Sequence, residues 1–95
     1  MNLVWTANAL RDLANLREYI ARNNPEAAKR VASAIHSYAE RQLDEYPNSG
    51  RPGRVAGTLE LVIPRLPFIL PYRIKDDRIE VLRVYHAARS WPENF

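Results

Sequence analysis

The chain of 95 residues contains no cysteine, which excludes disulfides and thiolate metal sites and fits a reducing compartment. No stretch approaches the roughly 18 consecutive apolar residues that a membrane span needs. The first residues, MNLVWTANALRDL, lack the basic segment and apolar run of a secretory signal. We therefore expect a soluble, cytoplasmic protein that forms a single domain over residues 1–95 and has no contact with membranes.

Lysine is also scarce, with two residues against twelve arginines. The basic excess lies in the second half, where residues 48–95 carry eight basic and five acidic side chains, whereas residues 1–47 carry six of each. Arginine is suited to bidentate contacts with phosphate or carboxylate. This distribution indicates an RNA, DNA or acidic protein partner, and a surface adapted only for solubility is the alternative.

Histidine occurs only at positions 36 and 86, a spacing that matches no metal-binding pattern. The glycines of GRPGRVAG do not form a phosphate loop, because no G-K-S/T follows them. We expect neither a metal nor a cofactor. His36 falls near the edge of an apolar helical stripe, which is typical of a surface residue without a catalytic role.

The first half predicts a short strand followed by two helices. NLVW is apolar and extended in character, and Thr6 is a good N-cap for a helix with apolar residues at helical spacing up to Ile20. Asn23 is a stop for that helix, while Asn24 and Pro25 suit the cap and first position of the next. The second helix continues to Pro47, so the two form an antiparallel helical hairpin.

The second half predicts three strands, at about residues 58–63, 68–75 and 79–85, with a turn at Asp76-Asp77. Pro71 lies inside the second of them and has no amide to donate, which requires either an edge position or a bulge. The fold class is therefore α+β in the order β-α-α-β-β-β. The N-terminal strand and helical hairpin pack on one face of a mainly antiparallel sheet.

Strand alternation sorts the polar side chains onto two faces. His86 shares a face with Leu82 and Val84, toward the helices. The opposite, open face is expected to gather a polar cluster with two arginines on neighbouring loops, namely Glu60, Arg73, Arg83, Tyr85, Arg54 and Arg65.

Such a cluster has the groups required to cleave RNA without metal, namely a base, a cation at the phosphate and an acid. Glu60 is the candidate base, Arg73 and Arg83 the phosphate clamp, and Tyr85 or His86 the acid. A structural network of salt bridges explains the same residues equally simply.

Several motifs resemble the ParE/RelE superfamily of bacterial type II toxin–antitoxin toxins. They are the W-T-x-x-A-x-x-D-L opening, G-x-x-E-L at residues 57–61, P-Y-R-I at residues 71–74, and the final H-A-x-R. The resemblance implies a growth-arresting toxin neutralised by an antitoxin that folds on binding. It also implies that operator DNA is contacted only through that antitoxin.

The superfamily divides by target. RelE-like members are ribosome-dependent mRNA endonucleases, and their pattern is matched in part by Glu60, Arg65, Arg83, Tyr85 and His86. ParE-like members inhibit DNA gyrase, and the H-A-x-R ending and scarcity of lysine favour this branch.

Whichever branch applies, the candidate contacts to the target or to phosphate are Arg54, Arg65, Arg73, Arg83 and Arg89. Fold analogy cannot decide between the targets. A small nucleic-acid-binding module without toxicity is the third interpretation.

Overall fold

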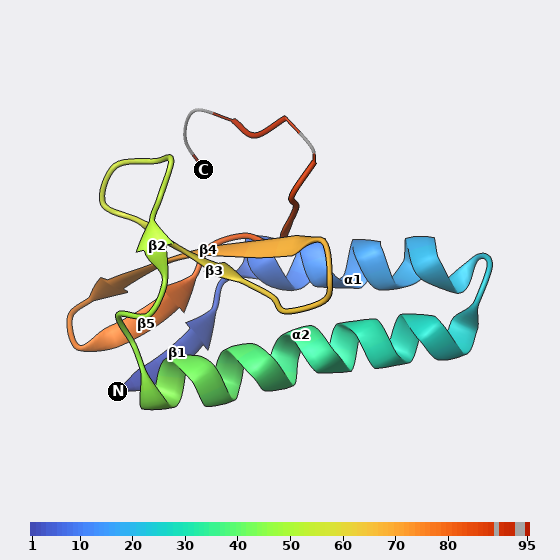
Figure 1. The fold of residues 1–95 in the computed structure, drawn as a ribbon, viewed down its shortest axis with the longest axis horizontal. Coiled ribbons are helices and arrows are strands. Elements are labelled where there is room, and N and C mark those ends of the chain that lie inside the picture. Colours follow the sequence, from blue (N-terminus) through green and yellow to red (C-terminus); the bar gives the residue numbers. More distant parts are fainter. Residues whose placement is uncertain (89, 93–94) are drawn as a thin grey trace.

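The computed structural model describes residues 1–88, 90–92 and 95. Its elements, in chain order, are β1 (Asn2–Trp5), α1 (Ala7–Ala21), α2 (Pro25–Glu45), β2 (Arg51–Pro52), β3 (Leu59–Val62), β4 (Phe68–Lys75), β5 (Arg78–Val81) and β6 (Tyr85–His86). The predicted α+β class and element order are confirmed, with β2 and β6 as additions (Figure 1).

Both helices begin where their capping residues predict. The Thr6 side chain accepts a hydrogen bond from the Ala9 amide, and the Asn24 side chain accepts one from the Ala27 amide. Pro25 occupies the first position of α2. The helix α1 ends at Ala21, two residues before the predicted stop. Within the described residues, neither helix combines the length and apolar character needed to cross a bilayer.

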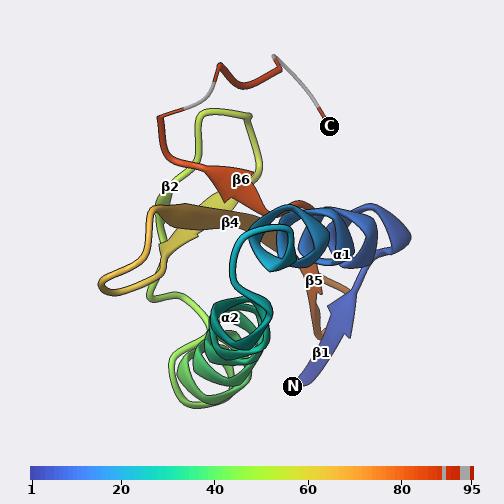
Figure 2. The same cartoon turned by 90° about the vertical axis from the view of Figure 1, so that its right-hand side faces the viewer.

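The sheet has the strand order β1-β5-β4-β3-β2, and β6 pairs with the first part of β4. Among the strands that the structure describes, β1 and β5 form the one parallel pair, and the long connection between them includes both helices. Figure 2 shows α2 below the sheet, whereas the loop after β2 and the C-terminal segment rise above it. The core fills the space between helices and sheet, with Ile35 and Leu43 facing Leu70, Tyr72 and Ile79.

A bulge interrupts the last strand opposite Pro71. Val81 pairs with Tyr72, but Tyr85 pairs with Ile69, so the register shifts by one residue between the two ladders. The Leu82 amide donates to the Pro71 carbonyl at 2.8 Å, but Pro71 has no amide to return the bond. Of the two predicted alternatives, an edge position or a bulge, the structure has a bulge, but it lies in the strand opposite Pro71. The prediction of one continuous strand over residues 79–85 is wrong.

Thr6 satisfies the carbonyl that Pro71 leaves without a donor. Its hydroxyl lies 3.1 Å from the Leu82 carbonyl oxygen and 2.9 Å from that of Val81. The residue that caps α1 therefore also fixes the bulge, and the start of the first helix is tied to the end of the fifth strand.

Candidate functional site

The face of the sheet turned away from the helices, here called the outer face, carries charged residues at its centre. Glu60 lies opposite Pro71 in the β3–β4 ladder, and Arg73 lies opposite Glu80 in the β4–β5 ladder. Alternation places these four residues on one face, because Leu61, Leu70 and Tyr72 between them belong to the core.

Glu60 holds the loop between β2 and β3 in place. Its side chain is 2% exposed, and its Oε1 accepts a bond of 3.1 Å from Arg51 Nε. Its Oε2 accepts a bond of 2.8 Å from the Arg54 backbone amide. One donor from β2 and one from the loop therefore engage both carboxylate oxygens, and Gly57 completes the loop at a φ of 80°, where glycine is favoured.

Glu80 organises a second arginine cluster on the same face. Arg73 Nε donates to one carboxylate oxygen, and Arg78 donates to the other at 3.0 Å from Nε. The hydrogen bond from Arg73, together with the charges of both arginines, lowers the pKa of Glu80. The side chains of Arg73 and Arg78 remain 43% and 48% exposed, so their outer edges stay accessible.

The lowered pKa predicts an acid-sensitive contribution to stability. Because the native pKa of Glu80 lies below its unfolded value, the stabilisation is complete above the ordinary glutamate pKa and is lost as pH falls through the native one. Chemical denaturation of the protein should show stability falling below about pH 5, and Glu80→Gln should make this fall shallower. Equal slopes for both proteins would contradict the role assigned to Glu80.

Arg83 does not join Glu60 and Arg73, contrary to the sequence-based expectation. Its Nε and Nη2 donate to Asp12 on α1 at 2.7 and 2.9 Å, and the Val84 amide donates to the same carboxylate at 3.0 Å. These bonds raise the pKa of Arg83. The one-residue shift at the bulge invalidates simple alternation here.

Asp12 is the structural residue that the strand analysis missed. It is the aspartate of the W-T-x-x-A-x-x-D-L opening, and the other motif residues also have structural contacts. Trp5 Nε1 donates to Glu40, Thr6 caps α1, and Ala9 is fully buried. Asp12 joins α1 to the sheet through Arg83. Its place in this motif was the feature of the sequence that could have indicated a structural role.

Tyr85 lies in a row of four stacked groups, in which two aromatic rings are flanked by two arginines. Arg83 Cζ is 4.8 Å from the centre of the Tyr85 ring, and the ring of Trp91 lies against Tyr85 at 4.9 Å. Arg54 Cζ follows at 3.8 Å from the centre of the Trp91 ring. The Tyr85 hydroxyl is buried and has no hydrogen-bond partner among the described residues, and burial raises its pKa.

The other predicted site residues are dispersed. His86 lies opposite Phe68, contacts its ring, and accepts a bond from the Ala88 amide at Nδ1, in keeping with a structural histidine. Arg65 is exposed in the turn before β4, with a φ of 66°. Arg89 lies outside the described residues.

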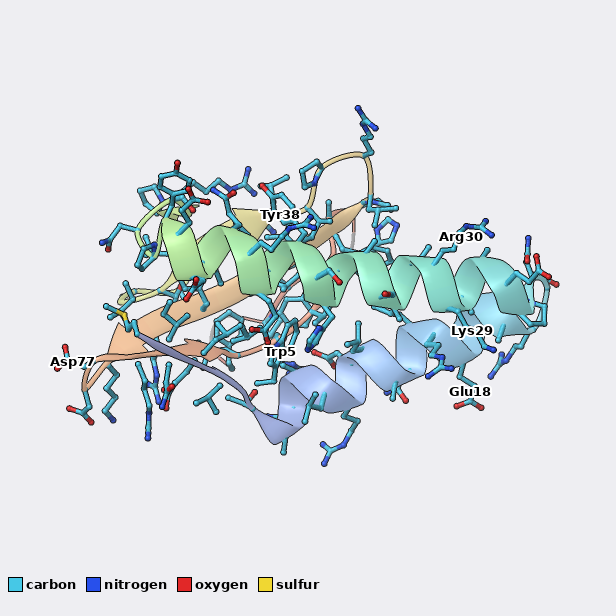
Figure 3. All side chains as sticks on the ribbon, turned by 90° about the horizontal axis from the view of Figure 1, so that it is seen from below. Trp5, Glu18, Lys29, Arg30, Tyr38 and Asp77 are labelled. Carbon is cyan, nitrogen blue, oxygen red and sulfur yellow. The ribbon has the colours of Figure 1, made fainter. Side chains whose placement is uncertain are left out.

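His36 has neighbours that its sequence position did not reveal. Its ring stacks on Trp5 with centroids 5.2 Å apart, and Nε2 lies 3.5 Å from Glu40. Its side chain is 50% exposed, so the predicted surface position is confirmed. Trp5 appears between the two helices when the molecule is seen from the helical side (Figure 3).

The geometry divides the proposed RNA-cleaving residues among three ion-pair groups. Glu60 belongs to Arg51 and Arg54, Arg73 to Glu80, and Arg83 to Asp12. Among the residues that the structure describes, no three histidine, aspartate or glutamate side chains are close enough to hold a metal ion. On the outer face Glu60 and Glu80 are each paired with two arginines, so positive charge exceeds negative charge in both groups.

Comparison with known proteins assigns the chain to the toxins of type II toxin–antitoxin systems. Residues 3–91 match the family described as the ParE toxin of the type II toxin–antitoxin system, parDE. The chain belongs to this family, and thereby to the ParE/RelE superfamily.

Two similar proteins are named as toxins. The chain is 47% identical over 89 residues to Y4kP of Sinorhizobium fredii, described as a candidate toxin, covering 94% of this chain and 91% of that protein. It is 37% identical over 87 residues to the toxin RelE2 of Caulobacter vibrioides, covering 92% of this chain and 96% of that protein.

Solved structures agree with this assignment. A chain of the chromosomal ParDE system from P. aeruginosa matches with a TM-score of 0.85 and 31% identity, over 90% of this chain and 95% of that one. A chain of the RelBE2 complex from Mycobacterium tuberculosis matches with a TM-score of 0.65 and 30% identity, over the same shares of 90% and 95%.

Proposed function

We propose that this toxin arrests growth by binding DNA gyrase rather than by cleaving RNA. The observation that carries the proposal is the engagement of Glu60, Arg73 and Arg83 in separate ion pairs. A general base must reach the ribose hydroxyl with a free oxygen, and both oxygens of Glu60 already accept hydrogen bonds. Without an assembled acid–base set, the protein acts by occupying a surface of its target.

A cognate antitoxin is the second partner in this proposal. Leu10 and Tyr19 on α1 are 50% and 70% exposed on opposite sides of the helix, which supports separate apolar contacts with a partner that wraps around the hairpin. The two similar structures come from the ParDE system and the RelBE2 complex, which are toxin–antitoxin pairs. The antitoxin is expected to neutralise the toxin, to fold on binding, and to carry the contact with operator DNA. Because the proposed partners, gyrase and the antitoxin, act in the cytoplasm, we assign the same location to the toxin.

Induction of the gene in bacterial cells tests the target. We expect a DNA-damage response to rise before protein synthesis falls, and co-expression of the antitoxin to prevent both effects. Immediate loss of translation with cleaved mRNA would instead support the RelE-like candidate.

One observation favours that second candidate: the ring of Tyr85 lies beside the guanidinium of Arg83. As an RNA-cleaving acid, Tyr85 would be required for toxicity. Under the gyrase proposal, Tyr85→Phe should arrest growth and induce the damage response, which reporter strains measure. Cleavage of mRNA by the original chain that is lost in a folded Tyr85→Phe protein would overturn the proposal.

A further inference from the structure

The C-terminal segment, residues 90–92 and 95 in the structure, lies over the outer face of the sheet. Figure 2 shows it on the same side as the loop after β2. Trp91 is held between Arg54 and Tyr85, and its Nε1 donates to the His86 carbonyl at 3.3 Å. The ring of Phe95 lies 5.9 Å from that of Tyr85. The segment therefore fills a slot that has a cation on one side and an aromatic ring on the other.

This arrangement leaves one polar group unsatisfied. The hydroxyl of Tyr85 is buried where the rings of Trp91 and Phe95 pack, and it has no acceptor among the described residues. A buried hydroxyl without a partner is unfavourable. A different occupant that brings an oxygen acceptor to Tyr85 would satisfy the hydroxyl that the described residues of the segment leave without a partner.

The charges around the slot define that occupant further. Arg51 and Arg54 share the single carboxylate of Glu60, and their side chains are 51% and 49% exposed. A cavity of about 380 Å³ adjoins the slot, with Arg73 and Phe95 among its lining residues. The excess of arginine over glutamate favours an acidic ligand.

We propose that the C-terminal segment is an intramolecular stand-in for an acidic peptide segment of a protein partner. The partner inserts an aromatic side chain between Arg54 and Tyr85 in place of Trp91, and an oxygen of the partner accepts a hydrogen bond from the Tyr85 hydroxyl. The inference deepens the proposed function and depends on it only in requiring a protein partner. The inference holds for any protein partner. If the toxin does not inhibit gyrase, the peptide-binding experiment below still tests the inference.

Fluorescence anisotropy of a labelled SWPENF peptide, added to the full-length protein, tests the proposal. In Trp91→Ala the slot is open, and we expect the peptide to bind about tenfold more tightly than to the original chain, since occupancy by Trp91 reduces the competent fraction. Trp91→Phe keeps a ring in the slot and should bind as weakly as the original chain.

Three controls assign the gain to the slot. Adding Arg54→Ala to Trp91→Ala should abolish the gain, whereas adding Arg41→Ala, on the exposed part of α2, should leave it intact. Adding Tyr85→Phe should leave the gain at least as large, because the described residues of this segment bring no acceptor to the hydroxyl. Circular dichroism should show the same fold for all variants.

Equal peptide binding by Trp91→Ala and the original chain would overturn the proposal. A gain for a labelled single-stranded RNA hexamer without a gain for the peptide would also overturn it, since the slot would then take a nucleobase. A peptide in which alanine replaces the tryptophan should not bind, and equal binding of that peptide would show that the ring is irrelevant.

Discussion

Asp12→Ala should lower the free energy of unfolding by about 3 kcal/mol, because it leaves a guanidinium and an amide without their acceptor. The side chains of Asp12 and Arg83 are only 15% and 26% exposed, so water replaces the lost bonds poorly. The expected fall in Tm is roughly 15 °C for a domain of this size. Thermal unfolding followed by circular dichroism measures it.

The matched control is Asp44→Ala, which removes an exposed aspartate from α2. Asp44 makes no ion pair with the residues that the structure describes, so its removal should change the stability by less than about 0.5 kcal/mol. Similar effects of the two substitutions would show that the contact between α1 and the bulge contributes little.

Glu60→Gln should release the loop between β2 and β3 while nearly preserving the side-chain volume. The amide presents an NH₂ group to a site where both carboxylate oxygens accept hydrogen bonds, so one donor from Arg51 or Arg54 loses its acceptor. We expect a loss of stability of about 2 kcal/mol. Trypsin should cleave after Arg54 about tenfold faster, because the loop opens more often.

Glu18→Gln serves as the comparison for this prediction. Glu18 is exposed on α1, and its side chain points away from both helices in Figure 3. It should leave stability and the rate of cleavage after Arg54 unchanged. If Glu60→Gln abolished toxicity without changing either quantity, Glu60 would be acting as a catalytic base.

Local signals in the sequence predicted much of the fold. Thr6 and the Asn24-Pro25 pair identified the helix starts, and β4 has the predicted bounds of residues 68–75. These features depend on side chains close to one another in the chain, where capping and alternation act directly. Pro71 also indicated an edge position or a bulge, since a proline within a sheet removes a ladder hydrogen bond.

The candidate site was harder to predict because it depends on contacts between distant segments. Alternation along residues 79–85 assumed an unbroken strand, and the register shift between Val81 and Tyr85 breaks that assumption. The pairing of residue 83 with residue 12 follows from the tertiary fold, not from spacing. The same applies to Trp91, whose place between Arg54 and Tyr85 has no periodic signal.

The most direct test of the account is a supercoiling assay with purified toxin, DNA gyrase and relaxed plasmid. The account predicts that supercoiling falls as toxin is added, that the antitoxin restores it, and that mRNA in a parallel translation reaction stays intact. Unchanged supercoiling together with mRNA cleavage on ribosomes would contradict it.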